Sequence, residues 1–199
     1  CWKDLTKPEY KGEVQIADPQ SAGTAYTALA TFVQLWCEKE AFNYFRQLHP
    51  NISQYTKSGV TPSRNAARGE TAIGIGFLHD VVYQIVDNGY DNLGMTAPSS
   101  GTSYEIGATA IFKGAKNVEN AQKFIEFALS PDCVNLAQEN GSYQFLVIDN
   151  AKPVKAAVKA GLDKIKTINY DFEDAKYHTS QYVQDFFKVI ASDDRVKTK

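Results

Sequence analysis

The run Ser21-Ala22-Gly23-Thr24 combines small side chains with hydroxyl groups at the expected start of a helix, directly after a predicted strand. Backbone amides in the first turn of a helix have no partner within the helix, and the helix dipole favours negative charge there. Such a terminus can bind a phosphate or a carboxylate. The alternative is an ordinary helix cap, because serine and threonine are common cap residues. We therefore treat these four residues as candidate anion ligands and keep both interpretations.

A second polar loop, Thr56-Lys57-Ser58-Gly59, precedes another expected helix. The hydroxyl groups of Thr56 and Ser58 could donate hydrogen bonds to the same anion. The alternative is a simple connection between two elements, since loops of this composition are common between strands and helices.

The stretch from Gly69 to Asp80 reads G-E-T-A-I-G-I-G-F-L-H-D, a strand-like run with two glycines. Bulky apolar residues alternate along one face, whereas Gly74 and Gly76 leave the other face without side chains. A glycine inside a strand marks a close approach of backbone or of a ligand. We expect Gly76 to lie against the ligand.

Two titratable residues, His79 and Asp80, follow this strand and begin a helix. In open α/β sheets, ligands bind at the carboxyl ends of the strands. His79 offers a ring donor or a cation, and Asp80 accepts hydrogen bonds from hydroxyl groups. Glu105 would face the same cleft from the far side of a hinge and could accept from a hydroxyl or an ammonium group. The structural alternatives are a surface histidine, an aspartate that favours the helix dipole, and a solvated glutamate.

Strands and helices alternate along the chain. A strand at 13–17 precedes an amphipathic helix at 23–38 and a short helix at 39–48; a helix at 63–68, a strand at 71–77 and a helix at 79–88 follow. Asn117 caps a further helix, Ser130-Pro131 starts another that ends at Gly141, and a last long helix starts near Asp171. This order predicts an α/β fold with helices packed on a mostly parallel sheet.

Composition excludes several classes of function. The net charge is -2, and no cationic stripe is present, so nucleic-acid binding is not expected. No run of about 18 apolar residues occurs, and the chain does not open with a basic region and an apolar core, so we expect neither a membrane span nor a signal peptide in it. Cys37 lies on the apolar side of the first helix pattern and is expected to be buried.

No catalytic motif is recognisable: the sequence lacks G-x-S-x-G, H-E-x-x-H and a P-loop, and its 3 histidines lie far apart. The three cysteines fit no zinc site. We predict that the protein is not an enzyme and that it holds no cofactor and no protein-bound metal. If the protein were an enzyme after all, His79 would be the candidate general base.

Several motifs together resemble the extracytoplasmic solute-binding proteins of bacterial ABC importers, in the branch that binds ferric iron, phosphonates and sugar phosphates. They are W-K-D-L-T-K-P-E-Y-K-G-E-V-Q-I-A-D-P (2–19), S-A-G-T-A-Y-T-A-L-A-T (21–31), Q-Y-T-K-S-G (54–59), A-R-G-E-T-A-I-G-I-G-F-L-H-D (67–80) and G-T-S-Y-E-I-G-A-T-A-I-F-K-G-A-K-N (101–117). The resemblance implies a type II periplasmic-binding fold, in which two α/β lobes close on a ligand and present it to a membrane permease. It also implies an extracytoplasmic, periplasmic location.

The family signature W-x-D-L-x-x-P-x-Y-x-G opens the second lobe of such proteins, and here it begins at Trp2. The resemblance therefore implies a chain shortened at its N-terminus. Residues 1–98 would form lobe two, 99–145 would be a remnant of lobe one after a hinge crossover at Met95 to Thr102, and 146–199 would return to lobe two. A remnant without its partners could exchange elements between two copies, which predicts a possible domain-swapped homodimer.

The resemblance leaves two ligand classes. Ferric-binding members carry two adjacent tyrosines after the strand that corresponds to 71–77, whereas this chain has Leu78-His79-Asp80. The expected solute is therefore a sugar phosphate or phosphonate, with its phosphate at residues 21–24 and 56–58 and its organic end at His79, Asp80 and Glu105. Iron(III) import is the alternative. At the start of the first helix the family's usual S-G-T reads Ala22-Gly23-Thr24 here, so one hydroxyl group of the expected phosphate site is missing.

Overall fold

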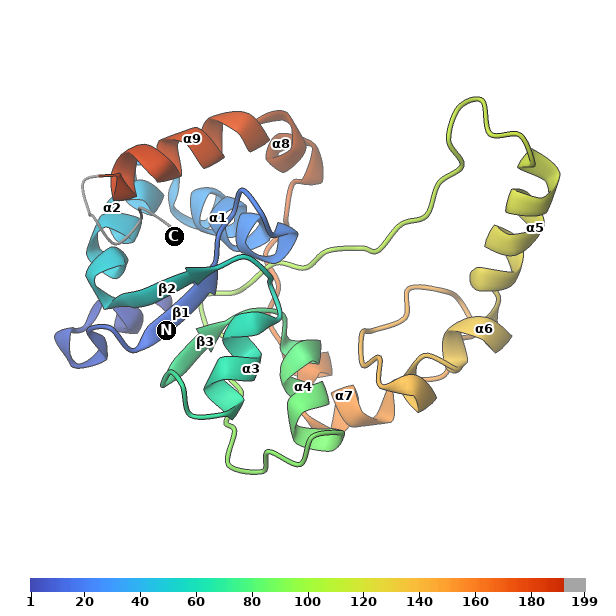
Figure 1. Ribbon diagram of the computed structural model, residues 1–199, viewed down its shortest axis with the longest axis horizontal. Helices are drawn as coiled ribbons and strands as arrows, with labels where there is room; N and C mark the ends of the chain where they lie inside the picture. Colours follow the sequence, from blue (N-terminus) through green and yellow to red (C-terminus); the bar gives the residue numbers. More distant parts are fainter. Residues whose placement is uncertain (192–199) are drawn as a thin grey trace.

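A three-stranded parallel sheet forms the centre of the computed structural model, which describes residues 1–191 (Figure 1). The strands are β1 (Val14–Ala17), β2 (Ile52–Thr56) and β3 (Ile73–Ile75), in the order β2-β1-β3. Ile16 of β1 pairs with Tyr55 on one side and with Ile75 on the other. Every residue of β1 is buried, as expected for a central strand covered on both faces. The predicted α/β fold with a mostly parallel sheet is confirmed.

A helix follows each strand, and further helices lie between residues 118 and 190. They are α1 (Gly23–Trp36), α2 (Glu38–Leu48), α3 (Thr61–Ala67), α4 (Leu78–Val86), α5 (Val118–Ala128), α6 (Pro131–Asn135), α7 (Lys155–Lys159), α8 (Phe172–Tyr177) and α9 (Thr179–Ile190). Short 3-10 helices lie at Trp2–Thr6 (η1), Pro8–Tyr10 (η2), His49–Asn51 (η3), Gln138–Asn140 (η4) and Leu162–Lys164 (η5). No helix within residues 1–191 has the length and apolar character that a membrane span requires.

The main core lies between the sheet and the layer formed by α1, α2 and α9 (Figure 1). Leu29 and Phe32 of α1 are fully buried, as the helical spacing of apolar residues predicts. Phe186 of α9 lies edge-on to Phe45 of α2, with ring centroids 5.1 Å apart. The helix α9 thereby packs on α2, and it also contacts α1, the helix whose start is the candidate anion site.

Four details of the predicted elements differ in the structure. The helix expected from Ser130-Pro131 to Gly141 is divided into α6, which ends at Asn135, and the 3-10 helix η4. The strand β2 was not predicted, and the single long helix from Asp171 is divided into α8 and α9 at His178. Cys37 is exposed rather than buried, because it joins α1 to α2 with a φ of 67°, outside helical geometry. Its side chain therefore leaves the apolar face that the α1 pattern describes.

The side of β3 that carries no side chains is covered by α3. A Cβ atom on Gly74 would overlap the carbonyl oxygen of Pro62 and lie 3.1 Å from the backbone nitrogen of Ser63. At Gly76 the nearest atoms are the Ser63 hydroxyl oxygen, at 2.9 Å, and the Gly59 carbonyl oxygen, at 3.4 Å. The sequence left open whether protein backbone or a ligand lies against these glycines. At Gly74 it is the backbone of α3.

A second, smaller core joins α4 to the segment that returns after residue 141. Its buried members are Val82, Tyr143, Val154, Ala157 and Leu162. The outgoing and returning segments touch where Thr102 pairs with Thr167, and the amide of Ile168 donates to the Thr102 carbonyl at 2.8 Å. The segments that precede and follow α5 and α6 are therefore held together at this point.

The helices α5 and α6 stand apart from both cores (Figure 1). No residue of α5 is buried, and Phe124 on its apolar face is 67% exposed. Phe112, in the extended segment before α5, is 90% exposed. The apolar face of α5 contacts α6 but is left largely uncovered within the described part of the chain.

Candidate ligand-binding site

The two polar loops predicted from the sequence lie side by side, because β1 and β2 are adjacent parallel strands. The amide of Asp18 donates to the Thr56 carbonyl at 2.8 Å, directly after the two strands end. The Ser21 hydroxyl donates to the Lys57 carbonyl at 3.0 Å. Ser21 therefore joins the loops to each other, and its hydroxyl is already engaged with protein.

The start of α1 has no side-chain cap. Ala22 occupies the cap position with extended backbone (φ -134°, ψ 121°), and no side chain accepts a hydrogen bond there. Within residues 1–191 no protein oxygen accepts from the amides of Gly23 and Thr24. The alternative of an ordinary serine or threonine cap therefore fails. Two amides at the positive end of a 14-residue helix are available to an external anion.

The loop after β2 packs closely on this helix end. A Cβ atom on Gly59 would overlap the hydroxyl of Thr24, so only glycine fits without a shift of one element. Thr56 is buried, and its hydroxyl donates to the Ser58 carbonyl at 2.9 Å. Thr56 thus shapes the loop, whereas the side chain of Ser58 is exposed.

Glu105 reaches the first turn of α1 from a distant part of the sequence. Its carboxylate accepts a hydrogen bond from the Thr27 hydroxyl, whose single proton is shared with the Gly23 carbonyl at 3.0 Å. The two carboxylate oxygens lie 3.8 and 3.9 Å from the position of a Cβ atom on Gly23. The exposed carboxylate therefore stands beside the free amides, where it can accept from a hydroxyl or ammonium group of a bound molecule.

His79 and Asp80 lie in the first turn of α4, just beyond the carboxyl end of β3. The His79 Nε2 atom is 3.5 Å from an Asp80 carboxylate oxygen, and the two side chains are 26% and 21% exposed. Burial lowers the pKa of His79, and the charge of Asp80 partly opposes that shift. Burial also raises the pKa of Asp80, against the charge of His79. Within the described residues no hydrogen bond joins this pair to the α1 terminus.

The shifted pKa of His79 predicts a pH-dependent stability. Because the folded state resists protonation of this ring, the free energy of unfolding should fall as the pH drops from about 7.5 to about 5.5, through the usual histidine pKa of about 6.5. The raised pKa of Asp80 has the opposite effect on the free energy of unfolding, which it increases as the pH falls. This effect belongs to a lower pH range, above the usual aspartate pKa of about 3.9. Urea unfolding of His79→Gln should show a smaller fall over this range than the parent chain. If the free energy of unfolding changed equally with pH in both proteins, burial of His79 would not be the cause of the fall.

Two residues of the site were not among the predicted ligands. Thr27 lies in the middle of a helical pattern, where a threonine gives no signal that its hydroxyl will hold a carboxylate 78 positions away. Gly59 closes the polar loop, and its close approach to Thr24 depends on the pairing of β1 with β2.

The sequence model of the family described as bacterial extracellular solute-binding protein matches residues 1–176, and the chain belongs to this family. An uncharacterised protein of Haemophilus influenzae is 56% identical over 173 residues, which are 87% of this chain and 49% of that protein. The chain therefore spans about half the length of this curated relative.

Solved structures of similar proteins agree with the family. The periplasmic binding protein AfuA from Actinobacillus pleuropneumoniae, solved with bound fructose-6-phosphate, is 50% identical and superposes with a TM-score of 0.88 over 96% of this chain and 60% of that one. The apo ferric ion-binding protein A of Pasteurella haemolytica has a TM-score of 0.78 over 97% of this chain and 62% of that one, but is only 19% identical. The second likeness shows a shared fold alone.

Proposed function

We propose that this chain is part of the solute-binding component of an ABC importer and that it captures a phosphorylated small solute, either a sugar phosphate or a phosphonate. The unengaged amides of Gly23 and Thr24 are the observation that carries the proposal. Amides at a helix terminus suit the several acceptor oxygens and the negative charge of a phosphate. The exposed Ser58 would add a hydroxyl donor from the neighbouring loop.

The organic end of the solute would meet Glu105, Asp80 and His79. A carboxylate next to a phosphate site disfavours a bare anion, but it accepts a hydrogen bond from a hydroxyl or an ammonium group carried by the same molecule. This pairing supports a phosphorylated polyol or amine over inorganic phosphate. The fructose-6-phosphate in the AfuA structure belongs to this chemical class, and half of that protein's aligned residues are identical here.

Iron(III) is the second candidate solute, supported by the shared fold with ferric ion-binding proteins. The donors of this lobe favour it less. Leu78-His79-Asp80 stands where ferric-binding members are expected to carry two adjacent tyrosines. In an iron carrier, the α1 terminus would instead hold an anion that accompanies the metal.

The proposal extends to the arrangement and location of the complete protein. Residues 1–98 would form the lobe that holds the phosphate, residues 99–145 would belong to the other lobe, and 146–199 would return to the first. The protein would act in the periplasm or outside the cytoplasmic membrane, deliver its solute to a membrane permease, and catalyse no reaction. The uncovered apolar face of α5 is compatible with a domain-swapped homodimer of this chain.

Thermal unfolding with added ligands tests the solute. Glucose 6-phosphate or 2-aminoethylphosphonate at millimolar concentration should raise the melting temperature, whereas glucose, ethanolamine and iron(III) citrate should not. In Asp80→Asn, which keeps the shape of the side chain, the shift with glucose 6-phosphate should shrink, since a charge-assisted hydrogen bond of about 1.5–3 kcal/mol is lost. Stabilisation by iron(III) alone would favour the second candidate. An undiminished shift in Asp80→Asn would remove Asp80 from the site.

A further inference from the structure

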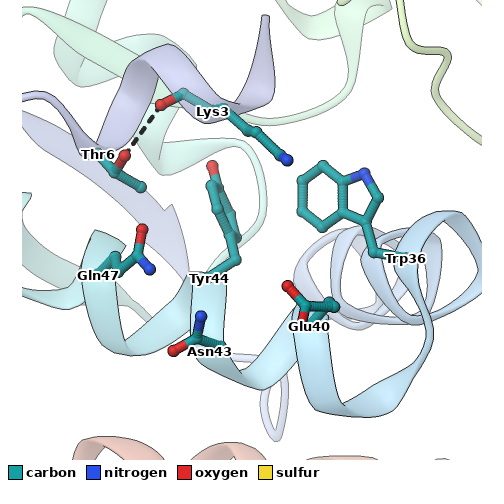
Figure 2. A pocket seen from close by; sticks show the side chains of 7 residues that line it. All are labelled: Lys3, Thr6, Trp36, Glu40, Asn43, Tyr44 and Gln47. Atoms are coloured by element: carbon teal, nitrogen blue, oxygen red, sulfur yellow. Dashed lines mark hydrogen bonds between the residues drawn. The ribbon is translucent and has the colours of Figure 1, made fainter.

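A separate pocket of about 340 Å³ lies between η1 and α2, beside the C-terminal end of α1 (Figure 2). Its volume is within the range of small-ligand pockets. Trp36 at the end of α1 and Lys3 of η1 form one side, and Glu40, Asn43 and Gln47 of α2 form the other, around Tyr44. None of these residues belongs to the proposed solute site.

Packing fixes the aromatic part of this pocket. The Trp36 ring stacks on Phe32, with an interplanar angle of 3° and centroids 5.3 Å apart, and it meets Tyr44 at 62° and 5.0 Å. The Tyr44 hydroxyl donates to the Trp2 carbonyl at 2.7 Å, so this ring cannot turn away. One face of the indole is therefore held by the core, and its orientation is set before anything binds.

The chain places an ammonium group of its own over the indole. The Lys3 Nζ atom lies 5.9 Å from the Trp36 ring centroid, within cation–π distance, and Figure 2 shows it directed toward the ring. The Lys3 side chain is exposed and makes no ion pair within residues 1–191, so it can leave the ring at little cost. The outer part of the pocket thus already accepts a positive charge.

The facing side of α2 supplies an acid and two amides. Glu40, Asn43 and Gln47 follow the spacing of one helix face, and all three are exposed without a hydrogen-bond partner in the described part of the chain. A carboxylate beside an electron-rich ring is the combination that recognises alkylammonium groups. An anion would instead meet the Glu40 charge.

We infer that the pocket formed by Lys3, Trp36, Glu40, Asn43, Tyr44 and Gln47 is a second binding site, for an alkylammonium group that takes the place of the Lys3 side chain over Trp36. The occupant is a small amine or quaternary ammonium compound, or the same group on a larger molecule. The inference does not depend on the proposed solute. Because Lys3 competes for the ring, its removal should strengthen binding of the ammonium group. If Lys3 were itself a ligand, its removal would weaken binding.

The indole N–H signals of ¹⁵N-labelled chain give a direct test, since the sequence has only 2 tryptophans, Trp2 and Trp36. Trp36→Phe assigns the two signals. Titration with tetramethylammonium chloride should shift the Trp36 signal with a dissociation constant of about 10 mM, whereas sodium chloride and tert-butanol should not. Lys3→Ala should tighten binding about threefold, and Glu40→Gln should weaken it about fivefold. Glu126→Gln on α5 is the matched control and should change nothing.

Three outcomes would overturn the inference. One is an unmoved Trp36 signal in both the parent chain and Lys3→Ala, with the Trp2 signal confirming that each is folded. Another is weaker binding in Lys3→Ala. The third is a Trp36 shift produced by methyl β-D-glucoside but not by tetramethylammonium, which would identify a carbohydrate site.

Discussion

Replacing Ala22 with aspartate should greatly weaken the binding of glucose 6-phosphate and at the same time make the free protein more stable. Ala22 has the extended backbone of a helix cap but no side chain to accept from the first-turn amides. An aspartate there would accept from them, and it would gain about 0.5–2 kcal/mol from the cap hydrogen bond and the helix dipole. The same carboxylate would occupy the proposed phosphate position and repel the dianion.

The expected changes have opposite signs, which a general disturbance of folding cannot produce. For a domain of this size, about 1 kcal/mol corresponds to a rise of about 2–4 °C in melting temperature. Calorimetric titration should show affinity for glucose 6-phosphate reduced by about 100-fold or more. Ala22→Asn, which caps without charge, should show a similar stability and a smaller loss of affinity. Unchanged affinity in Ala22→Asp would mean that the phosphate lies elsewhere.

Replacing Gly74 with alanine should cost more stability than any other single methyl group added to the sheet. The new Cβ atom would overlap the carbonyl of Pro62 and press on the amide of Ser63, and both are backbone atoms of α3 that cannot rotate away. Overpacking of this kind costs about 1–3 kcal/mol. Urea unfolding should therefore show a clearly lower midpoint for Gly74→Ala.

Gly107→Ala provides the control for this loss. Nothing lies within 4 Å of its Cβ position, and its backbone does not need a positive φ, so its stability should be unchanged or slightly raised. A Gly74→Ala protein as stable as the parent would show that α3 does not rest on β3 as described. The positions of His79 and Asp80, which follow β3, would then not be fixed by the packing of α3 on this strand.

The sequence was sufficient for those elements whose local pattern and packing agree. In α1, Ala25, Leu29, Phe32 and Val33 repeat with helical spacing and are all buried in the main core. The strand β2 escaped prediction because only its end residues, Ile52 and Thr56, are buried, while Ser53 and Gln54 between them are exposed. Its pairing with β1 holds it in place, and no local signal reports that pairing.

The same distinction applies to the site. The convergence of residues 21–24 and 56–58 was expected from the family resemblance and not from the local pattern, because the strand β2 that places the second loop beside the first was not predicted. That Ser21 bonds to the neighbouring loop instead of capping α1 could not be predicted, because its choice of partner depends on the Lys57 carbonyl. The cover over Gly74 likewise depends on the packing of α3. Glu105 was expected to face the cleft, but its hydrogen bond with Thr27 could not be predicted, because it joins segments 78 residues apart in the sequence.

Backbone amide shifts of ¹⁵N-labelled chain during titration with glucose 6-phosphate test the central claim most directly. If the phosphate binds at the start of α1, the amide signals of Gly23 and Thr24 should move far downfield and saturate together with binding, and equal concentrations of glucose should leave them in place. Saturable binding of glucose 6-phosphate with both signals unmoved would contradict the account.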